Sequence, residues 1–202
     1  MKISKIEPQK RNKTRSTIYI NGKFAFGLSN EIVLKYDLNE GGEIDDDLIQ
    51  NVLLAQERQR IRERAFRILR YRRRTVQELK TRLLRLGFEN NLVDDVLEEL
   101  VQDKTLDDTI FAEAFAADYT KLKPKGNIFI RRELAKRGIS TEIIENLIQG
   151  RDERFLVEEF IQKKLARFNL KDPKDKRRLI QRLLTRGFTP RIVYEVVNAY
   201  EK

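Results

Sequence analysis

The densest set of chemically active side chains in the sequence is a run of nine arginines between residues 58 and 74. Guanidinium groups in such numbers bind anions, because each presents several hydrogen-bond donors together with a fixed positive charge. Only Glu57, directly before this stretch, and Glu63 within it carry compensating charge. The run consists of Arg58, Arg60, Arg62, Arg64, Arg67, Arg70, Arg72, Arg73 and Arg74.

Helical spacing would sort this stretch into two faces. The apolar face would consist of Ile61, Ala65 and Ile68. The parallel cationic face would consist of Arg60, Arg64 and Arg67. Residues three and four apart are neighbours on a helix, and like charges at that spacing cost stability. An anionic partner is therefore a reason to keep them, and a solvated face with local ion pairs is the alternative.

Two further basic sets occur later in the chain. One comprises Lys121, Lys123, Lys125, Arg131 and Arg132, and the other comprises Lys174, Lys176, Arg177, Arg178 and Arg182. Pro124 and Gly126 interrupt the first of these sets, which predicts a mobile loop that leads into a helix and suits phosphate contacts. The candidate residues for contact with a partner or with DNA are Arg60, Arg64, Arg67, Arg70, Arg72, Arg73, Arg74, Lys121, Lys123, Lys125, Arg131, Arg132, Lys174, Lys176, Arg177, Arg178 and Arg182.

Residues for catalysis are scarce by comparison. The chain has no histidine and no cysteine, so the commonest general base, the commonest metal ligand and the thiol nucleophile are all missing. No serine has a histidine partner, and no glycine-rich phosphate loop exists. Asp45, Asp46 and Asp47 suit the first turn of a helix better than a metal site, because no further ligands stand at fixed spacing. We expect a protein that is not an enzyme and has neither cofactor nor metal.

Composition agrees with a binding protein. The 42 lysines and arginines exceed the 32 acidic residues, and the net charge of +10 favours nucleic acid, an acidic protein surface or a membrane face as partner. No apolar run approaches the roughly 20 residues that span a bilayer, and no secretory apolar segment follows Met1. We therefore expect a cytoplasmic protein without a membrane segment. We also expect a monomer.

An internal repeat of roughly 50 residues organises most of the chain. Gly87, Gly138 and Gly187 mark it, and each has a leucine four residues before it and an apolar residue directly after it. This pattern is typical of a helix that ends at a glycine with left-handed backbone, where the following apolar residue packs back on the last turn. Each copy has one amphipathic segment before the glycine-terminated helix and another after it. The pattern predicts three helices in each repeat.

Signals for helix starts support this division. Thr75 to Glu78 has the pattern of a capping box, Ser140 suits an N-cap, and Asp172-Pro173 and Thr189-Pro190 suit an N-cap followed by proline at N1. The helix after each glycine carries a core-facing stripe. Its corresponding members are Leu92, Val96 and Leu97; Ile143, Leu147 and Ile148; and Ile192, Val196 and Val197. The first helices of the repeats are expected around residues 61–69, 110–119 and 155–168, with linkers near 121–127 and 169–172.

The first 28 residues alternate in the manner of strands. Residues 16–20 and 23–28 flank Asn21-Gly22, the dipeptide best suited to a two-residue hairpin turn, and residues 2–8 form a further strand. The alternation places Ile18, Ile20, Phe24 and Phe26 on one face. A short helix is expected from Ser29 to about Tyr36, with Gly41-Gly42 as a break after it.

The predicted fold is mostly helical, with three tandem three-helix repeats in an elongated array and a small antiparallel sheet at the N-terminus. The expected parts are an N-terminal hairpin region with a short helix (1–44), a linker helix with repeat 1 (45–104), repeat 2 (105–150) and repeat 3 (151–202).

Several landmarks in repeats 1 and 2 resemble the RecX regulatory family, the modulators of the RecA recombinase. They are Arg74-Thr75-Val76-Gln77-Glu78-Leu79 before Gly87-Phe88, then Leu106-Asp107-Asp108 with Phe111-Ala112, and then Gly126 before Arg132-Glu133-Leu134 and Lys136-Arg137-Gly138-Ile139. The resemblance extends more loosely over repeat 3. Asp107 and Asp108 are expected to cap helices at a repeat junction.

The resemblance implies a crescent of three repeats that lies in the groove of the RecA filament on DNA. There it would obstruct filament growth and inhibit the ATPase, strand-exchange and co-protease activities. The partners would be the RecA filament and phosphates of single- or double-stranded DNA, with no membrane partner. The alternative is a stand-alone basic helical protein that binds DNA or RNA, because three-helix units with a basic helix can imitate helix-turn-helix modules.

Overall fold

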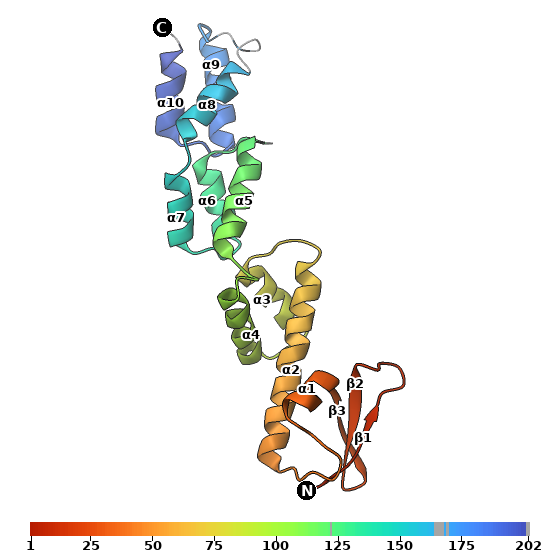
Figure 1. Ribbon diagram of the computed structural model, residues 1–202. Helices are drawn as coiled ribbons and strands as arrows, with labels where there is room; N and C mark the ends of the chain where they lie inside the picture. The colour runs from red at the N-terminus through yellow and green to blue at the C-terminus, as the bar shows by residue number, and fades with distance from the viewer. Residues whose placement is uncertain (122, 164–167, 169, 201–202) are drawn as a thin grey trace. The chain divides into compact units, whose positions relative to one another are not determined.

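The computed structural model describes residues 1–121, 123–163, 168 and 170–200, with the exception of the Lys121 side chain. Its strands are β1 (Ile3–Pro8), β2 (Arg15–Ile20) and β3 (Lys23–Ser29). Its helices are α1 (Asn30–Lys35), α2 (Asp46–Leu69), α3 (Val76–Leu84), α4 (Asn90–Gln102), α5 (Asp108–Lys121), α6 (Asn127–Ala135), α7 (Thr141–Gln149), α8 (Glu153–Gln162), α9 (Pro173–Thr185) and α10 (Pro190–Ala199), as Figure 1 labels them. The prediction of a mostly helical fold with an N-terminal sheet is confirmed.

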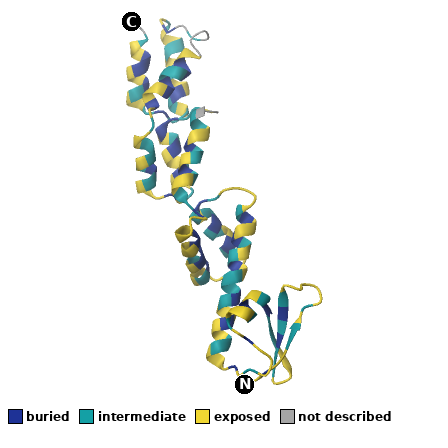
Figure 2. Ribbon diagram, in the orientation of Figure 1, coloured by how far each residue is buried: buried dark blue, intermediate teal, exposed yellow. Residues whose placement is uncertain are grey.

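The chain divides into two compact units. The first contains Met1–Tyr71 and Arg82–Glu99, and the second contains Arg72–Thr81 and Leu100–Lys202. Figure 2 shows that helices in both units have buried and exposed sides, as amphipathic helices around apolar cores require.

In the first unit, β1, β2 and β3 form an antiparallel sheet in that order. Asn21 and Gly22 have φ values of 49° and 80°, so both central residues of the β2–β3 turn are left-handed, as the two-residue hairpin requires. The sheet packs with α1 and the start of α2 around an apolar core. That core includes Ile3, Ile18, Leu28, Ile32, Leu38, Ile44 and Val52.

The predicted sheet face is wrong at one residue. Ile18 is buried and pairs with Phe26, but Phe24 is 67% exposed. The register shifts between Ile18 and Tyr19, so that Phe24 pairs with Tyr19 instead of continuing the face that Ile18 occupies. Such a bulge inserts one residue into a strand and changes which side chains point inward. Strict alternation therefore overestimated the apolar face.

Side-chain caps fix the starts of α1 and α2. The Ser29 hydroxyl accepts a hydrogen bond from the backbone N–H of Ile32, and the Asp45 carboxylate accepts one from that of Leu48 at 2.7 Å. Each cap satisfies one of the backbone donors that a helix leaves open in its first turn. Among the residues that the structure describes, no three carboxylates gather into a group able to hold a metal ion.

The three glycines end equivalent helices, which confirms the repeat. Gly87, Gly138 and Gly187 have φ values of 87°, 78° and 78°. In the second copy, Ile139 N–H donates to the Leu134 carbonyl oxygen and Gly138 N–H to that of Ala135, which is the hydrogen-bond pattern of the Schellman motif. The leucines four residues before the glycines are all fully buried.

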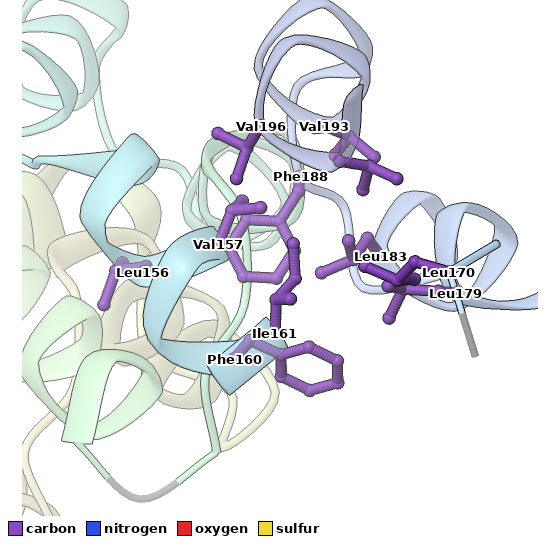
Figure 3. Packing of buried hydrophobic residues seen from close by; sticks show 11 residues of the cluster. Leu156, Val157, Phe160, Ile161, Leu170, Leu179, Leu183, Phe188, Val193 and Val196 are labelled. Atoms are coloured by element: carbon purple, nitrogen blue, oxygen red, sulfur yellow. The ribbon is translucent and has the colours of Figure 1, made fainter. Parts of the chain in front are cut away.

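The helices after the glycines carry the predicted core stripe in part. Val96, Leu97, Val196 and Val197 are buried, whereas the other predicted members, Leu92, Ile143, Leu147, Ile148 and Ile192, are only partly buried. In every copy the residue that follows the first stripe position is fully or almost fully buried, namely Val93, Ile144 and Val193. Repeat 3 shows how such a stripe closes its core: in Figure 3, Phe188 lies among side chains from α8, α9 and α10, including Val157, Leu183 and Val196. Phe188 itself has no exposed surface.

The predicted N-cap positions are confirmed at three helix starts, where Ser140, Asp172-Pro173 and Thr189-Pro190 begin α7, α9 and α10. Ser140 and Asp172 accept hydrogen bonds from their own helices, whereas the Thr189 hydroxyl donates to Glu153. The capping box is half right. Thr75 accepts from Glu78 N–H at 3.1 Å, but the Glu78 carboxylate pairs with Arg72 instead of returning to the helix start. The helix predicted for residues 155–168 occurs as α8. Residues 164–167 of that predicted helix and residue 169 of the predicted linker lie outside the described residues.

Candidate partner-binding surfaces

The cationic face predicted on α2 is present. Ile61, Ala65 and Ile68 are buried and turn that side of α2 inward. Arg60 and Arg67 are exposed and Arg64 is partly exposed, which follows from helical geometry once the apolar side is fixed. Arg60 pairs with Glu57 at 2.6 Å, whereas Arg64 and Arg67 form no ion pair with any described residue. The face therefore presents guanidinium groups that a partner can reach.

Two other arginines of the run are compensated by α4, which corrects the expectation that only Glu57 and Glu63 offset the charge. Arg58 lies 2.9 Å from Asp95, and Arg62 lies 3.2 Å from Glu99. These acids are 37 residues away in sequence, so helical spacing could not predict the pairing. Arg58 and Arg62 help to hold α2 against α4 and are poor candidates for partner contact.

The arginines around residue 72 divide in the same way. Glu78 pairs with Arg72 at 3.0 Å, lies 3.9 Å from Arg74 and lies 3.8 Å from Arg137 of repeat 2. Arg72 and Arg74 thus take part in the junction between α3 and α6. Arg70 and Arg73 are exposed and form no ion pair with a described residue.

The second basic set is mostly engaged within the protein. Arg131 makes a two-pronged contact with Glu145, with N–O distances of 2.7 and 2.8 Å. This hydrogen bond raises the pKa of Arg131 and lowers that of Glu145. The ammonium group of Lys125 stands 4.7 Å from the centre of the Phe129 ring, and the guanidinium group of Arg132 stands 5.7 Å from it. Lys123 is exposed, and the side chain of Lys121 lies outside the described residues.

The loop before α6 is anchored by hydrogen bonds at its described end. Gly126 N–H donates to the Arg186 carbonyl oxygen at 3.1 Å, and Arg186 donates to the Pro124 carbonyl oxygen at 3.0 Å. The glycine belongs there for a steric reason, because a Cβ atom on Gly126 would overlap the backbone of Gly187 and Phe188. Residue 122, in the same predicted linker, lies outside the described residues.

The third basic set lies on α9 and is the most concentrated. Leu179 and Leu183 are buried, so the opposite side of α9 faces outward. Arg178 is 75% exposed and stands 3.4 Å from Asp175. Lys174, Arg177 and Arg182 are exposed and form no ion pair with a described residue. Lys176 is partly exposed and has interactions of its own.

Carboxylates at the repeat junctions accept hydrogen bonds from backbone N–H groups, and the sequence predicted these roles only in part. Asp107 caps its own helix by accepting from Thr109 and Ile110 N–H, as expected. Asp108 instead accepts from Val76 N–H at 3.0 Å, at the start of α3 in the preceding repeat. Burial raises the pKa of Asp108, and the backbone hydrogen bond opposes this effect.

Glu153 occupies the equivalent place at the next junction and was missed. Its carboxylate accepts from Asn127 N–H at 2.6 Å and from the Thr189 hydroxyl at 2.6 Å, although Glu153 is only 3% exposed. Arg151 stands beside it and donates to Asn127, to Thr120 and to the Lys125 carbonyl oxygen. Burial lowers the pKa of Arg151. The signal was available in the sequence, because Asp108 and Glu153 both stand at the start of the first helix of a repeat.

Comparison with known proteins places these features in a family. Residues 1–45 match the Regulatory protein RecX N-terminal domain, residues 62–100 match the first three-helix domain of RecX, and residues 107–148 match its second three-helix domain. No helix within the described residues is both long and apolar enough to cross a membrane.

Relatives of known name agree over nearly the whole chain. Regulatory protein RecX of Halalkalibacterium halodurans is 32% identical over 96% of this chain and 76% of its own length, and that of Bacillus velezensis is 28% identical over 98% and 75%. A crystal structure of regulatory protein RecX superposes with a TM-score of 0.79 at 27% identity and covers 98% of both chains. RecX from Lactobacillus salivarius shares the fold, with a TM-score of 0.63 at 20% identity over 73% of this chain and 98% of its own. The chain belongs to the RecX family of regulatory proteins.

Proposed function

We propose that this protein binds the RecA recombinase filament on DNA and inhibits its recombinase, ATPase and co-protease activities without catalysing a reaction. It would act as a cytoplasmic monomer that occupies a surface. The resemblance of its repeat landmarks to RecX proteins supports this role, and so does the naming of its relatives as regulatory proteins.

The observation that carries the proposal is the cationic face of α2. Arg64 and Arg67 have no acidic partner among the described residues, and Arg60 forms an ion pair only with Glu57. Neighbouring like charges on a helix cost a few tenths of a kcal/mol for each pair, so this face is retained at some expense to stability. A negatively charged filament surface would offset that cost and orient the protein as it docks.

Co-sedimentation tests the proposal. The protein would be spun with RecA assembled on single-stranded DNA, with the same DNA alone, and without either. We expect it to pellet with the RecA filament at concentrations where it stays in solution with DNA alone. Equal recovery with DNA alone would instead support the stand-alone nucleic-acid-binding protein that the sequence also allowed.

A further inference from the structure

In repeats 1 and 2, the first turn of the middle helix, α3 or α6, packs against the glycine turn of the following repeat. The turn that contains Gly138 packs on Gln77 of α3, where an added Cβ atom would stand 2.5 Å from the Gln77 Cβ. The turn that contains Gly187 packs on Phe129 of α6, with a corresponding separation of 2.6 Å. The same structural device therefore joins repeat 1 to repeat 2 and repeat 2 to repeat 3.

Hydrogen bonds complete both junctions. The first N–H of α3, from Val76, donates to the Asp108 carboxylate, and the first N–H of α6, from Asn127, donates to that of Glu153. A carbonyl oxygen just after α6 also takes part in the first junction, because the Thr75 hydroxyl donates to the Arg137 carbonyl oxygen at 2.7 Å. A docking face of this kind offers helix N–H donors and a side-chain surface of matching shape.

The equivalent face of α9 is built differently. Its first residue is Pro173, which has no N–H to offer, and Asp172 of the same chain segment already accepts from Lys174 N–H at 3.0 Å. Counted back from the glycines, Arg177 and Arg178 stand where α3 has Gln77 and Glu78. Within the described residues no glycine turn packs on this face. This face of α9 therefore presents cationic side chains where the equivalent faces of α3 and α6 contact the following repeat.

These cations line a groove of about 730 Å³ along one side of α9. The lining residues are Lys174, Arg177, Arg178, Gln181, Arg182, Thr185 and Arg186. None of them is acidic, and the spacing follows a single helix face. Arg186 is partly held by the Phe160 ring at 4.9 Å and by the Pro124 carbonyl oxygen. Lys174, Arg177 and Arg182 have no acidic partner among the described residues.

We propose that this groove on α9 binds the phosphodiester backbone of a nucleic acid without reading its sequence. The cationic face spans 12 residues and thus about 18 Å, a length over which one strand of duplex DNA carries about five phosphates. Guanidinium groups bind phosphate oxygens in a two-pronged geometry, and Gln181 and Thr185 add neutral donors between them. A regular polymer of phosphates fits this row better than an acidic peptide, whose charges are irregularly spaced.

The inference deepens the proposed function, because the RecA filament in that proposal carries DNA. The two can fail separately, since binding to DNA is measured with no RecA present. If wild-type protein bound DNA through α9 but left RecA activity unchanged, the groove assignment would stand and the proposed regulation would not.

The test compares two variants that each remove three positive charges. The first replaces Lys174, Arg177 and Arg182 by alanine, and the control replaces Lys10, Lys13 and Lys23, which are exposed residues of the sheet region. Binding to a fluorescein-labelled single-stranded oligothymidylate would be followed by anisotropy over a series of salt concentrations. Each lost phosphate contact lowers the log–log salt slope by about 0.7, so the α9 variant should lose about 2 from its slope while the control stays near wild type.

Two further samples sharpen the result. A variant with Arg177→Lys and Arg182→Lys keeps the charge and should keep most of the slope. Polyglutamate should bind weakly and without dependence on the α9 residues. The proposal would be overturned if the α9 variant and the control had the same slope, or if the α9 substitutions abolished binding to polyglutamate and left binding to DNA intact.

Discussion

Gly126 lies directly against the backbone of Phe188, and this contact joins the start of α6 to the turn after α9. A methyl group at residue 126 would overlap backbone atoms, which cannot rotate away as a side chain can. We therefore expect Gly126→Ala to lower the free energy of unfolding by about 3 kcal/mol, at the upper end of the usual cost of overpacking. Urea denaturation followed by circular dichroism measures it.

Gly150→Ala is the matched control for that variant. Gly150 has a φ of −79°, and an added Cβ atom would meet only the Leu147 carbonyl oxygen at an ordinary 3.6 Å. Its unfolding free energy should remain within about 1 kcal/mol of wild type. Similar losses at residues 126 and 150 would argue against the junction described for α6 and α9.

The repeat glycines allow backbone strain and packing to be separated. Gly87→Ala should cost about 1 kcal/mol, because φ is positive while nothing lies within 4 Å of the added Cβ atom. Gly138→Ala should cost clearly more, because its Cβ atom would also meet Gln77. Thermal denaturation of both variants gives the comparison, and an equal loss would show that Gln77 moves away freely.

Glu153 holds together donors from two repeats, so its removal should be costly. Glu153→Ala leaves the buried Asn127 N–H and the Thr189 hydroxyl without their acceptor, and we expect a loss of about 3 kcal/mol in unfolding free energy. Glu195→Ala, at an exposed acid 3.6 Å from Arg154, should cost less than about 1 kcal/mol. Equal costs in urea denaturation would deny Glu153 its role at the junction.

Asp108 should make a contribution to stability that depends on pH. Its pKa is raised in the folded protein from the ordinary value of 3.8, chiefly by burial, so the folded state holds the proton more tightly than the unfolded state. The resulting stabilisation is full below about pH 4 and is lost as the pH rises through the folded-state pKa. Relative to Asp108→Asn, the wild-type protein should therefore lose unfolding free energy over that interval. A difference between the two proteins that stays constant from pH 4 to pH 7 would contradict the assignment.

The repeat and its helix ends could be predicted because their signals are local. A glycine with left-handed backbone, a leucine four residues earlier and an apolar residue directly after it lie within one turn, so Gly87, Gly138 and Gly187 were sufficient to locate three equivalent helices. The Asn21-Gly22 turn and the acidic start of α2 at Asp45 were predictable for the same reason.

The features that the sequence did not reveal depend on which segments meet. The shift that exposes Phe24 arises from strand pairing, and the ion pairs that occupy Arg58 and Arg62 come from α4. Whether an arginine is available to a partner is therefore decided by tertiary contacts. Sequence spacing could identify the basic sets, but it could not separate Arg62 from Arg64.

The cationic face of α2 is expected to act in inhibition. A variant with Arg60→Ala, Arg64→Ala and Arg67→Ala should need roughly tenfold more protein to reach half-maximal inhibition of RecA, which corresponds to about 1.4 kcal/mol of binding free energy. Circular dichroism should show unchanged helix content, because these side chains are exposed or partly exposed and lie away from the apolar side of α2. Wild-type inhibition by this variant would move the contact to another face.

The most direct test of the regulatory role is the DNA-dependent ATPase rate of RecA on single-stranded DNA, measured as this protein is added. If the protein blocks filament growth by occupying its surface, the rate should fall strongly with far fewer than one copy per RecA subunit. An ATPase rate that is unchanged at equal concentrations of the two proteins would contradict the proposed function.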